Sequence, residues 1–243
     1  RAIRGWGRPP PPFPGPPTPL VVRIRSAQTP PVNPYLHLVT EYNRLFREGK
    51  HLPHGGFPPA PAPPIPPDAP KALIFSPHPD DECIIGALPL RLRREAGWDV
   101  INIAVTQGSN VARQAERWEE LKNACRYIGF AVEQTAPNGL EKVGPKTRAA
   151  DAPRWQSMVQ TIAGVLRRHQ PRAIFFPHEH DWNSTHIGVH FLVMDALALL
   201  GSGIETRLVE TEYWGQMTAP NLMVESSESD VADMVTAVSF HVG

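Results

Sequence analysis

The stretch KALIFSPHPDDECIIG, residues 71–86, joins a short apolar run to a cluster of polar side chains that can bind metals. Residues 73–75 predict a buried strand, and His78 and the three adjacent carboxylates of residues 80–82 follow directly after it. Neighbouring carboxylates repel one another, and a folded protein rarely holds them together without a cation or a proton that relieves the repulsion. The stretch therefore predicts a metal site at the carboxyl end of a strand.

From residue 71 onward, apolar runs that predict strands alternate with amphipathic segments that predict helices. Such alternation means right-handed crossovers between parallel strands. The predicted fold class is therefore α/β: a Rossmann-like, doubly wound, mostly parallel sheet with helices on both faces. Pro89 predicts a kink in the first helix of this domain. We expect strands at 71–77, 99–107, 130–134, 173–177 and 204–214, and helices at 83–97, 112–129, 153–170, 185–201 and 230–241.

Residues 1–70 are predicted to form a proline-rich N-terminal arm before this domain, which spans residues 71–243. The arm holds 20 of the 29 prolines, chiefly in the runs 8–19 and 57–70. These runs favour extended segments that wrap or link the domain, and a polyproline II ligand for an aromatic groove is the alternative. Between them, an amphipathic helix over about 34–49 is expected to dock on the main domain.

The charge of the chain gives no reason to expect nucleic acid or an anionic membrane as a partner. Lys plus Arg and Asp plus Glu each number 24, so the formal net charge is zero. We expect no membrane span, because no run approaches the roughly 18 apolar residues that a bilayer requires. Cys83 and Cys125 are expected to be free thiols of a cytoplasmic protein. The sequence begins with Arg1, however, which leaves a removed targeting segment open.

A second polar cluster, PHEHDWNSTH at residues 177–186, follows the predicted strand that ends at residue 177. In open α/β sheets, ligands bind beyond the carboxyl ends of the strands, and both polar clusters are predicted to lie there. His78 and Asp81, three residues apart on a turn, can converge on one cation, with Asp80 directed elsewhere. Two nitrogens and one carboxylate with an open position are the usual ligands of catalytic zinc. The alternative is a helix-capping turn without a metal.

The run P-H-P-D-D-E after the first strand, with a later histidine that opens a helix (H-I-G-V from residue 186), resembles the LmbE-like (PIG-L) zinc-dependent N-deacetylase family. The resemblance covers about residues 71–243. It implies hydrolysis of an N-acetyl group on an N-acetylglucosamine unit in a conjugate, with one zinc ion per chain. It also implies that His78, Asp81 and His186 are zinc ligands and that Asp80 is the general base.

The chain departs from the family in its second motif, where H-x-D-H is replaced by N-S-T-H at residues 183–186. Asn183 is expected to donate a neutral hydrogen bond to an oxyanion in place of the family's histidine. Asp181, His178 and His180 are candidates for a role as general acid or as a support of a metal ligand. The proton for the leaving amine is expected from Asp80 itself or from a histidine of the 178–180 pair. The sequence leaves this choice open.

Three further residues are candidates for binding substrate. The stretch R-Q-A-E-R-W-E-E, residues 113–120, resembles the family's R-x-x-E helix, which makes Arg113 and Arg117 candidates. The alternative for both arginines is a solvated helix face. Trp182 either stacks on a sugar face or closes the core.

The family resemblance adds a separate candidate for the active site. Family members often carry a histidine near the C-terminus, and His241 is expected to reach the site from that end.

Together these features predict a zinc hydrolase whose partner is a small-molecule amino-sugar conjugate, and the resemblance allows a homo-oligomer. One alternative is a zinc amidase of the same fold that acts on another acyl amide. The other is a non-catalytic binding protein, which the altered second motif and the proline-rich arm favour. The intact HPDDE run argues against the binding protein, because a scaffold has no use for two ligands beside a base.

Overall fold

The structure is a computed structural model that describes residues 33–242. The predicted proline-rich run 8–19 lies outside the described residues. Contacts divide the chain into two compact units that meet between His51 and Leu52, and each unit is described by itself. The predicted domain boundary at residue 70 stays a prediction.

The first unit contains the helix α1, Leu36–Gly49, at the place where the amphipathic pattern predicts one. Leu38, Tyr42 and Leu45 recur at helical spacing along one side. Arg44 forms ion pairs with residues one turn away in both directions, Glu41 at 2.9 Å and Glu48 at 2.7 Å. Such pairs stabilise the helix from within. Docking of this helix on the main domain stays a prediction.

The described residues of the second unit form a five-stranded sheet in the order β3-β2-β1-β4-β5. All neighbouring strands pair in parallel, which confirms the predicted α/β fold. The order runs outward from β1 in both directions, so a topological switch point lies between β1 and β4. The strands are β1 Lys71–Ser76, β2 Asp99–Ala104, β3 Ala131–Gln134, β4 Ala173–Pro177 and β5 Arg207–Thr211.

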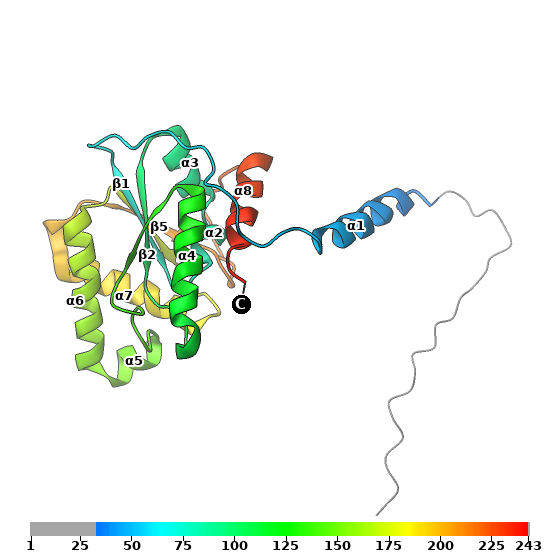
Figure 1. Ribbon diagram of the computed structural model, residues 1–243. Coiled ribbons are helices and arrows are strands. Elements are labelled where there is room, and N and C mark those ends of the chain that lie inside the picture. Colours follow the sequence, from blue (N-terminus) through cyan, green and yellow to red (C-terminus); the bar gives the residue numbers. More distant parts are fainter. Residues whose placement is uncertain (1–32, 243) are drawn as a thin grey trace, which may run out of the picture. The chain divides into compact units, whose positions relative to one another are not determined.

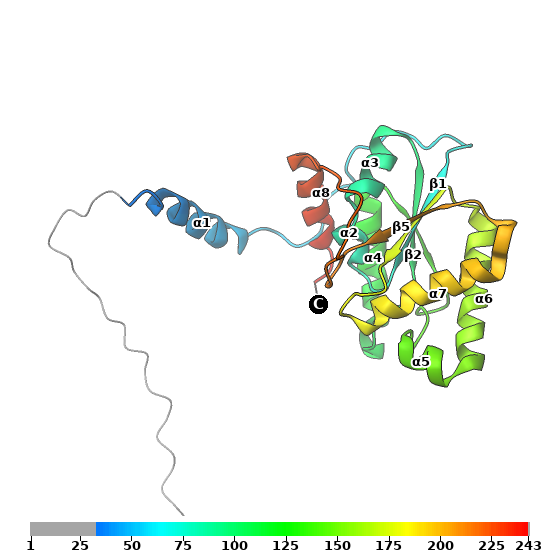
Figure 2. The same cartoon turned by 180° about the vertical axis from the view of Figure 1, so that it is seen from behind.

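Helices cover both faces of this sheet, as Figures 1 and 2 show. Helices α6 and α7 pack on one face, and α3, α4 and α8 lie on the other. The helices are α2 Asp81–Ile84, α3 Ala87–Glu95, α4 Gln114–Ile128, α5 Pro145–Ala150, α6 Ala152–His169, α7 Ser184–Leu200 and α8 Glu228–Val238, with 3-10 turns at Val111–Arg113 and Gly201–Gly203.

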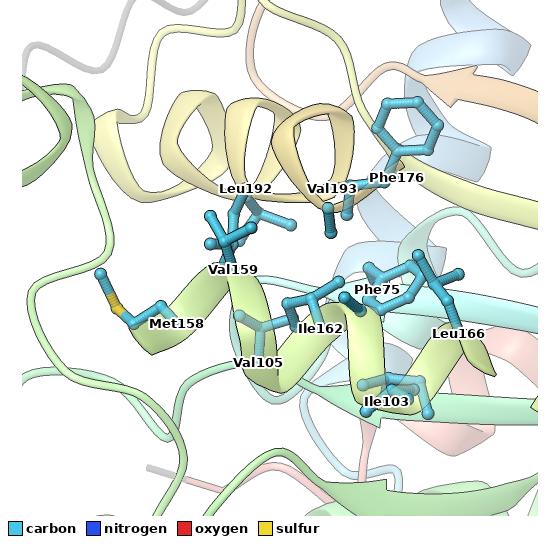
Figure 3. Close-up of a cluster of buried hydrophobic side chains, with 14 of the residues drawn as sticks. Phe75, Ile103, Val105, Met158, Val159, Ile162, Leu166, Phe176, Leu192 and Val193 are labelled. Carbon is cyan, nitrogen blue, oxygen red and sulfur yellow. The ribbon is translucent and has the colours of Figure 1, made fainter. Parts of the chain in front are cut away.

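The core has two layers because successive residues of a strand point to opposite faces of the sheet. In β1, Leu73 and Phe75 belong to the cluster that α6 and α7 cover, which Figure 3 shows in close-up. Ala72 and Ile74 belong to the cluster on the other face. All four side chains are fully buried, which explains why β1 is apolar without interruption.

Two details differ from the sequence prediction. The predicted kinked helix at 83–97 is two helices, because α2 ends at Ile84 and α3 begins at Ala87. Pro89 lies in the first turn of α3, where its missing N–H costs no hydrogen bond, and therefore causes no kink. The short helix α5 lies between the predicted strand at 130–134 and the predicted helix at 153–170, where no helix was predicted. Its six residues are too few to show a periodic pattern.

Among the described residues, the segment Ser184–Gly203 is long and apolar enough to cross a membrane by length and composition. It is the exception to the expectation that no run approaches this length. A helix that packs on the core of a domain passes the same test, and 39% of this segment is buried. Val189, Leu192, Val193 and Ala196 are fully buried between α6 and the sheet.

The packing of α7 predicts a large difference between two identical substitutions on this helix. Leu192 is fully buried and Leu199 is 47% exposed. We expect Leu192→Ala to lower the free energy of unfolding by about 2–5 kcal/mol, because it leaves a cavity in the core. The matched control Leu199→Ala is expected to cost less than about 1 kcal/mol. Urea denaturation measures both, and equal losses would contradict the packing described for α7.

Candidate functional site

The switch point between β1 and β4 brings together the two polar clusters of the sequence. Ala72 pairs with Ala173, and Ile74 pairs with Phe175, so β1 and β4 are parallel and in register. The segments that follow these two strands therefore leave the sheet at the same edge. The loop after β1 carries His78 and leads into α2, whereas the loop after β4 leads into α7. The predicted ligands therefore come from two separate loops that meet.

His78, Asp81 and His186 converge through one donor atom each. Nδ1 of His78 lies 3.2 Å from Nε2 of His186. Oδ2 of Asp81 lies 3.6 Å from the same atom of His78 and 3.4 Å from the same atom of His186. The loop is held in this form by the backbone N–H of His78, which donates to Oδ2 of Asp81 at 2.8 Å. The three donors thus form a nearly equilateral triangle.

This triangle fits a bound metal ion. Donors placed about 2.0–2.2 Å from a tetrahedral metal ion lie about 3.3–3.6 Å apart, which matches the observed spacings. Burial lowers the pKa of His186, and the nearby His78 acts in the same direction, so this ring is neutral with a lone pair available for a metal. Two imidazole nitrogens and a carboxylate oxygen are also the donor set that suits zinc.

The carboxylate of Asp181 lies near the ring nitrogen of His186 that does not belong to the triangle. Oδ2 of Asp181 lies 3.7 Å from Nδ1 of His186, and that nitrogen has no hydrogen-bond partner among the described residues. The backbone N–H groups of Asn183 and Trp214 donate to Asp181 at 2.8 Å and 3.1 Å and fix the carboxylate. A carboxylate on the far nitrogen orients a metal-binding histidine and makes it a stronger ligand. The structure therefore places Asp181 in the supporting role that the sequence left open.

Asp80 sits between the ligand loop and α2 in a strained backbone conformation. Its φ of 104° lies in the left-handed region, which non-glycine residues rarely adopt. Burial raises the pKa of Asp80 to about 6, and the negative charges of Asp81 and Glu82 add to this effect. A carboxyl group with this pKa is ionised at neutral pH and can still hold a proton during a reaction, which suits a general base.

The structure distributes the candidates of the second motif over different roles. Asn183 caps α7, since its Oδ1 accepts the N–H of Thr185 at 2.8 Å. His178 is buried with both ring nitrogens engaged: Nε2 donates to the carbonyl of Gly215, and Nδ1 accepts the N–H of His180. The ring of His180 is 74% exposed, and its charged neighbour is Glu179 at 3.8 Å. The structure does not bring His180 to the triangle.

The predicted substrate-binding residues also lie in different settings. Arg117 supports the ligand loop, because its guanidinium donates to the carbonyl of Pro79 at 3.0 Å. Arg113 forms ion pairs with Glu116 and Glu120, both at 3.2 Å. Trp182 is 79% exposed, so it does not close the core and is free to contact a ligand.

Tyr213 lies at the site, although the sequence patterns did not predict it. Its ring meets that of His186 edge-on, with 4.7 Å between the ring centres. Its hydroxyl group is buried without a partner among the described residues, and burial raises the pKa of Tyr213 well above its usual value. The phenol therefore stays protonated beside the metal ligands. Tyr213 lies near the carboxyl end of the predicted strand at 204–214 and just after β5, which ends at Thr211. This position, at the edge where the other site residues lie, is the signal that could have found it.

A cavity of about 400 Å³ opens beside the triangle. His78 and Thr185 line it, and its wall combines polar side chains, such as Ser109, Gln114 and Lys142, with apolar ones. This volume is within the range of small-molecule sites. A ligand in this cavity would lie directly against the candidate metal site.

Three potential metal ligands beside a further carboxylate, at the switch point of a parallel α/β sheet, are typical of metal-dependent hydrolases. The family profile described as "PIG-L: GlcNAc-PI de-N-acetylase" matches residues 73–197, just over half of the chain. The chain belongs to this family. Membership places it among the deacetylases, which are amide hydrolases that act on carbon–nitrogen bonds.

Solved structures share this fold at low sequence identity. The conserved protein TT1542 from Thermus thermophilus is 21% identical with a TM-score of 0.53, over 70% of this chain and 78% of that chain. The zinc-inhibited form of teicoplanin deacetylase Orf2 is 13% identical with a TM-score of 0.54, over 70% and 83%. The A40926 pseudoaglycone deacetylase Dbv21 is 14% identical with a TM-score of 0.51, over 72% and 82%. The sequence matched no curated protein.

The triangle predicts that a divalent metal binds through His186. We expect titration with Zn²⁺ to show tight binding to the wild-type protein and its loss in His186→Ala. The control His190→Asn lies one turn further along α7 and keeps a donor toward the carbonyl of Pro177, which His190 contacts at 3.0 Å. It should bind Zn²⁺ as the wild type does. Unchanged binding by His186→Ala would rule out the triangle as the metal site.

Proposed function

We propose that the protein is a zinc-dependent hydrolase that removes the N-acetyl group from an N-acetylglucosamine-type amino sugar or its conjugate, with one zinc ion per chain. The observation that carries this proposal is the triangle of His78, Asp81 and His186 with Asp80 next to it in the chain. Family membership supports the deacetylase reaction. The cavity beside His78 supports a small-molecule substrate.

In this proposal the chain's own groups hold the substrate and move the proton. Zinc, when bound, supplies a Lewis acid for the amide carbonyl and lowers the pKa of water to near 7. Asp80 accepts a proton from the attacking water, which its pKa of about 6 allows. In its acid form, Asp80 then returns this proton to the nitrogen of the leaving amine.

Two observations favour Asp80 over a histidine as the acid. Both ring nitrogens of His178 are occupied by backbone groups, and the ring of His180 faces solvent. Asn183 keeps the proposed role of oxyanion donor. Its Oδ1 is fixed by the helix cap, which leaves the two hydrogens of its side-chain amide free to donate to a substrate oxygen.

The direct test is release of acetate from a panel of N-acetylglucosamine conjugates, measured before and after treatment with a chelator and again after zinc is added back. We expect release that the chelator abolishes and zinc restores. Protein that holds one zinc per chain but releases no acetate would favour another acyl amide as substrate. Protein that binds no zinc and releases no acetate would favour the binding-protein alternative.

The proposed role of Asp80 predicts that metal binding and catalysis separate. We expect Asp80→Asn to keep zinc while the rate falls by about 10²–10⁴-fold, which is the usual contribution of a general base. His78→Ala, by comparison, should lose both zinc and activity. Single-turnover assays with parallel metal analysis measure both quantities, and a normal rate in Asp80→Asn would exclude Asp80 as the base.

A further inference from the structure

Glu82 is fully buried directly after the candidate ligand Asp81, and the proposed reaction gives it no part. Its Oε2 accepts a hydrogen bond from the backbone N–H of Asp80 at 3.0 Å. Its Oε1 accepts one from the thiol of Cys83 at 3.0 Å and lies 3.0 Å from Nε2 of His241. A buried carboxylate is costly unless it is paired and hydrogen-bonded. These partners therefore hold the carboxylate in place, and the carboxylate in turn holds the loop.

The contact between Glu82 and Asp80 matters because the backbone of Asp80 is strained. A non-glycine residue with a φ of 104° keeps this conformation only where its surroundings fix it. Glu82 fixes the N–H of this residue, and Arg117 fixes the preceding carbonyl, that of Pro79. The same turn carries His78 and Asp81, so the strain is held at the centre of the ligand loop.

His241 reaches Glu82 from a segment that is 159 positions away in the sequence. The segment, residues 239–242, is itself anchored at several points. Oγ of Ser239 accepts the N–H of Gly55 at 3.1 Å, and the ring of Phe240 packs against that of Tyr127 with 5.8 Å between centres. The imidazole of His241 is therefore presented to Glu82 on a fixed support.

We propose that His241 is a positioning residue for the metal site. It donates to Glu82, which holds the N–H of Asp80 and so keeps the turn of residues 78–81 in its ligand-binding form. The inference rests on the proposed metal site and is independent of which acyl amide is the substrate. Among the described residues, the side-chain hydrogen bond of His241 is with Glu82 and not with a candidate ligand, so His241 acts through Glu82.

A different role for this cluster is a second metal site, because donor atoms of Glu82, Cys83 and His241 all lie within 4.8 Å of one another. The contacts favour the positioning role. The thiol and the imidazole both approach the same oxygen, Oε1 of Glu82. Both lie 3.0 Å from this oxygen, which is a hydrogen-bond distance and shorter than the spacing of about 3.3–3.6 Å between ligands of one tetrahedral metal ion.

The test compares variants of the full chain. His241→Phe keeps the ring volume and removes the donor, and His241→Leu replaces it should the phenyl variant not fold. His241→Gln keeps a donor at the reach of Nε2. Ser239→Ala, the matched control, removes hydrogen bonds of the same segment without touching Glu82. Zinc affinity is measured by competition with a chromophoric chelator, and amide hydrogen exchange of residues 78–84 is measured in metal-free protein.

We expect His241→Phe to weaken zinc binding by about 10–100-fold, the usual effect of losing an outer partner of a metal site. Amide exchange in residues 78–84 should also become faster. His241→Gln should restore both towards the wild type, and Ser239→Ala should change only the Tm. In a Glu82→Gln background, His241→Phe should add little, because the path runs through Glu82.

Wild-type affinity and exchange in His241→Phe would overturn the proposal and leave His241 a structural residue. Two zinc ions in the wild type and one in His241→Phe would overturn it in favour of a second metal site. A third outcome separates this proposal from the proposed function. If the wild type binds no zinc, the proposed function fails. Faster amide exchange confined to residues 78–84 in His241→Phe would then still support the role of His241 in holding this turn.

Discussion

The parallel pairing of β1 with β4 is the constraint on which the site depends. It brings the ends of two strands, nearly 100 residues apart in the sequence, to the same crevice at the switch point of the sheet. The pairing rests on a core in which β1 is buried on both faces. A shift of one residue in this register would move Asp81 away from His186 and turn the apolar side chains of β1 to the opposite faces.

The three consecutive carboxylates of residues 80–82 are tolerated because each has a different environment. Asp81 lies beside two imidazole nitrogens, with which it forms the candidate cation site. Glu82 is buried among hydrogen-bond donors, one of which comes from His241. Burial, together with the negative charges of Asp81 and Glu82, raises the pKa of Asp80. The repulsion between these neighbouring charges thus also shifts the pKa of Asp80 towards the range that suits proton transfer.

Local patterns were sufficient to predict much of this structure. Alternating strands and helices indicated the parallel sheet, and the positions of the two polar clusters after strands indicated where the candidate ligands meet. The break between α2 and α3 was missed because α2 has only four residues, too few to show a periodic pattern of its own. The contacts of Tyr213 with His186 and of His241 with Glu82 were not predicted, since they arise only when distant segments pack. The roles of Arg117 and His178 likewise depend on backbone carbonyls that the sequence does not reveal.

The central claim is that one metal ion binds between His78, Asp81 and His186. X-ray absorption spectroscopy of protein loaded with one equivalent of Zn²⁺ tests it most directly. The account predicts a first shell of nitrogen and oxygen alone at about 2.0–2.2 Å, with the outer scattering of two imidazole rings. A sulfur ligand at about 2.3 Å would place the metal at Cys83 and contradict the account.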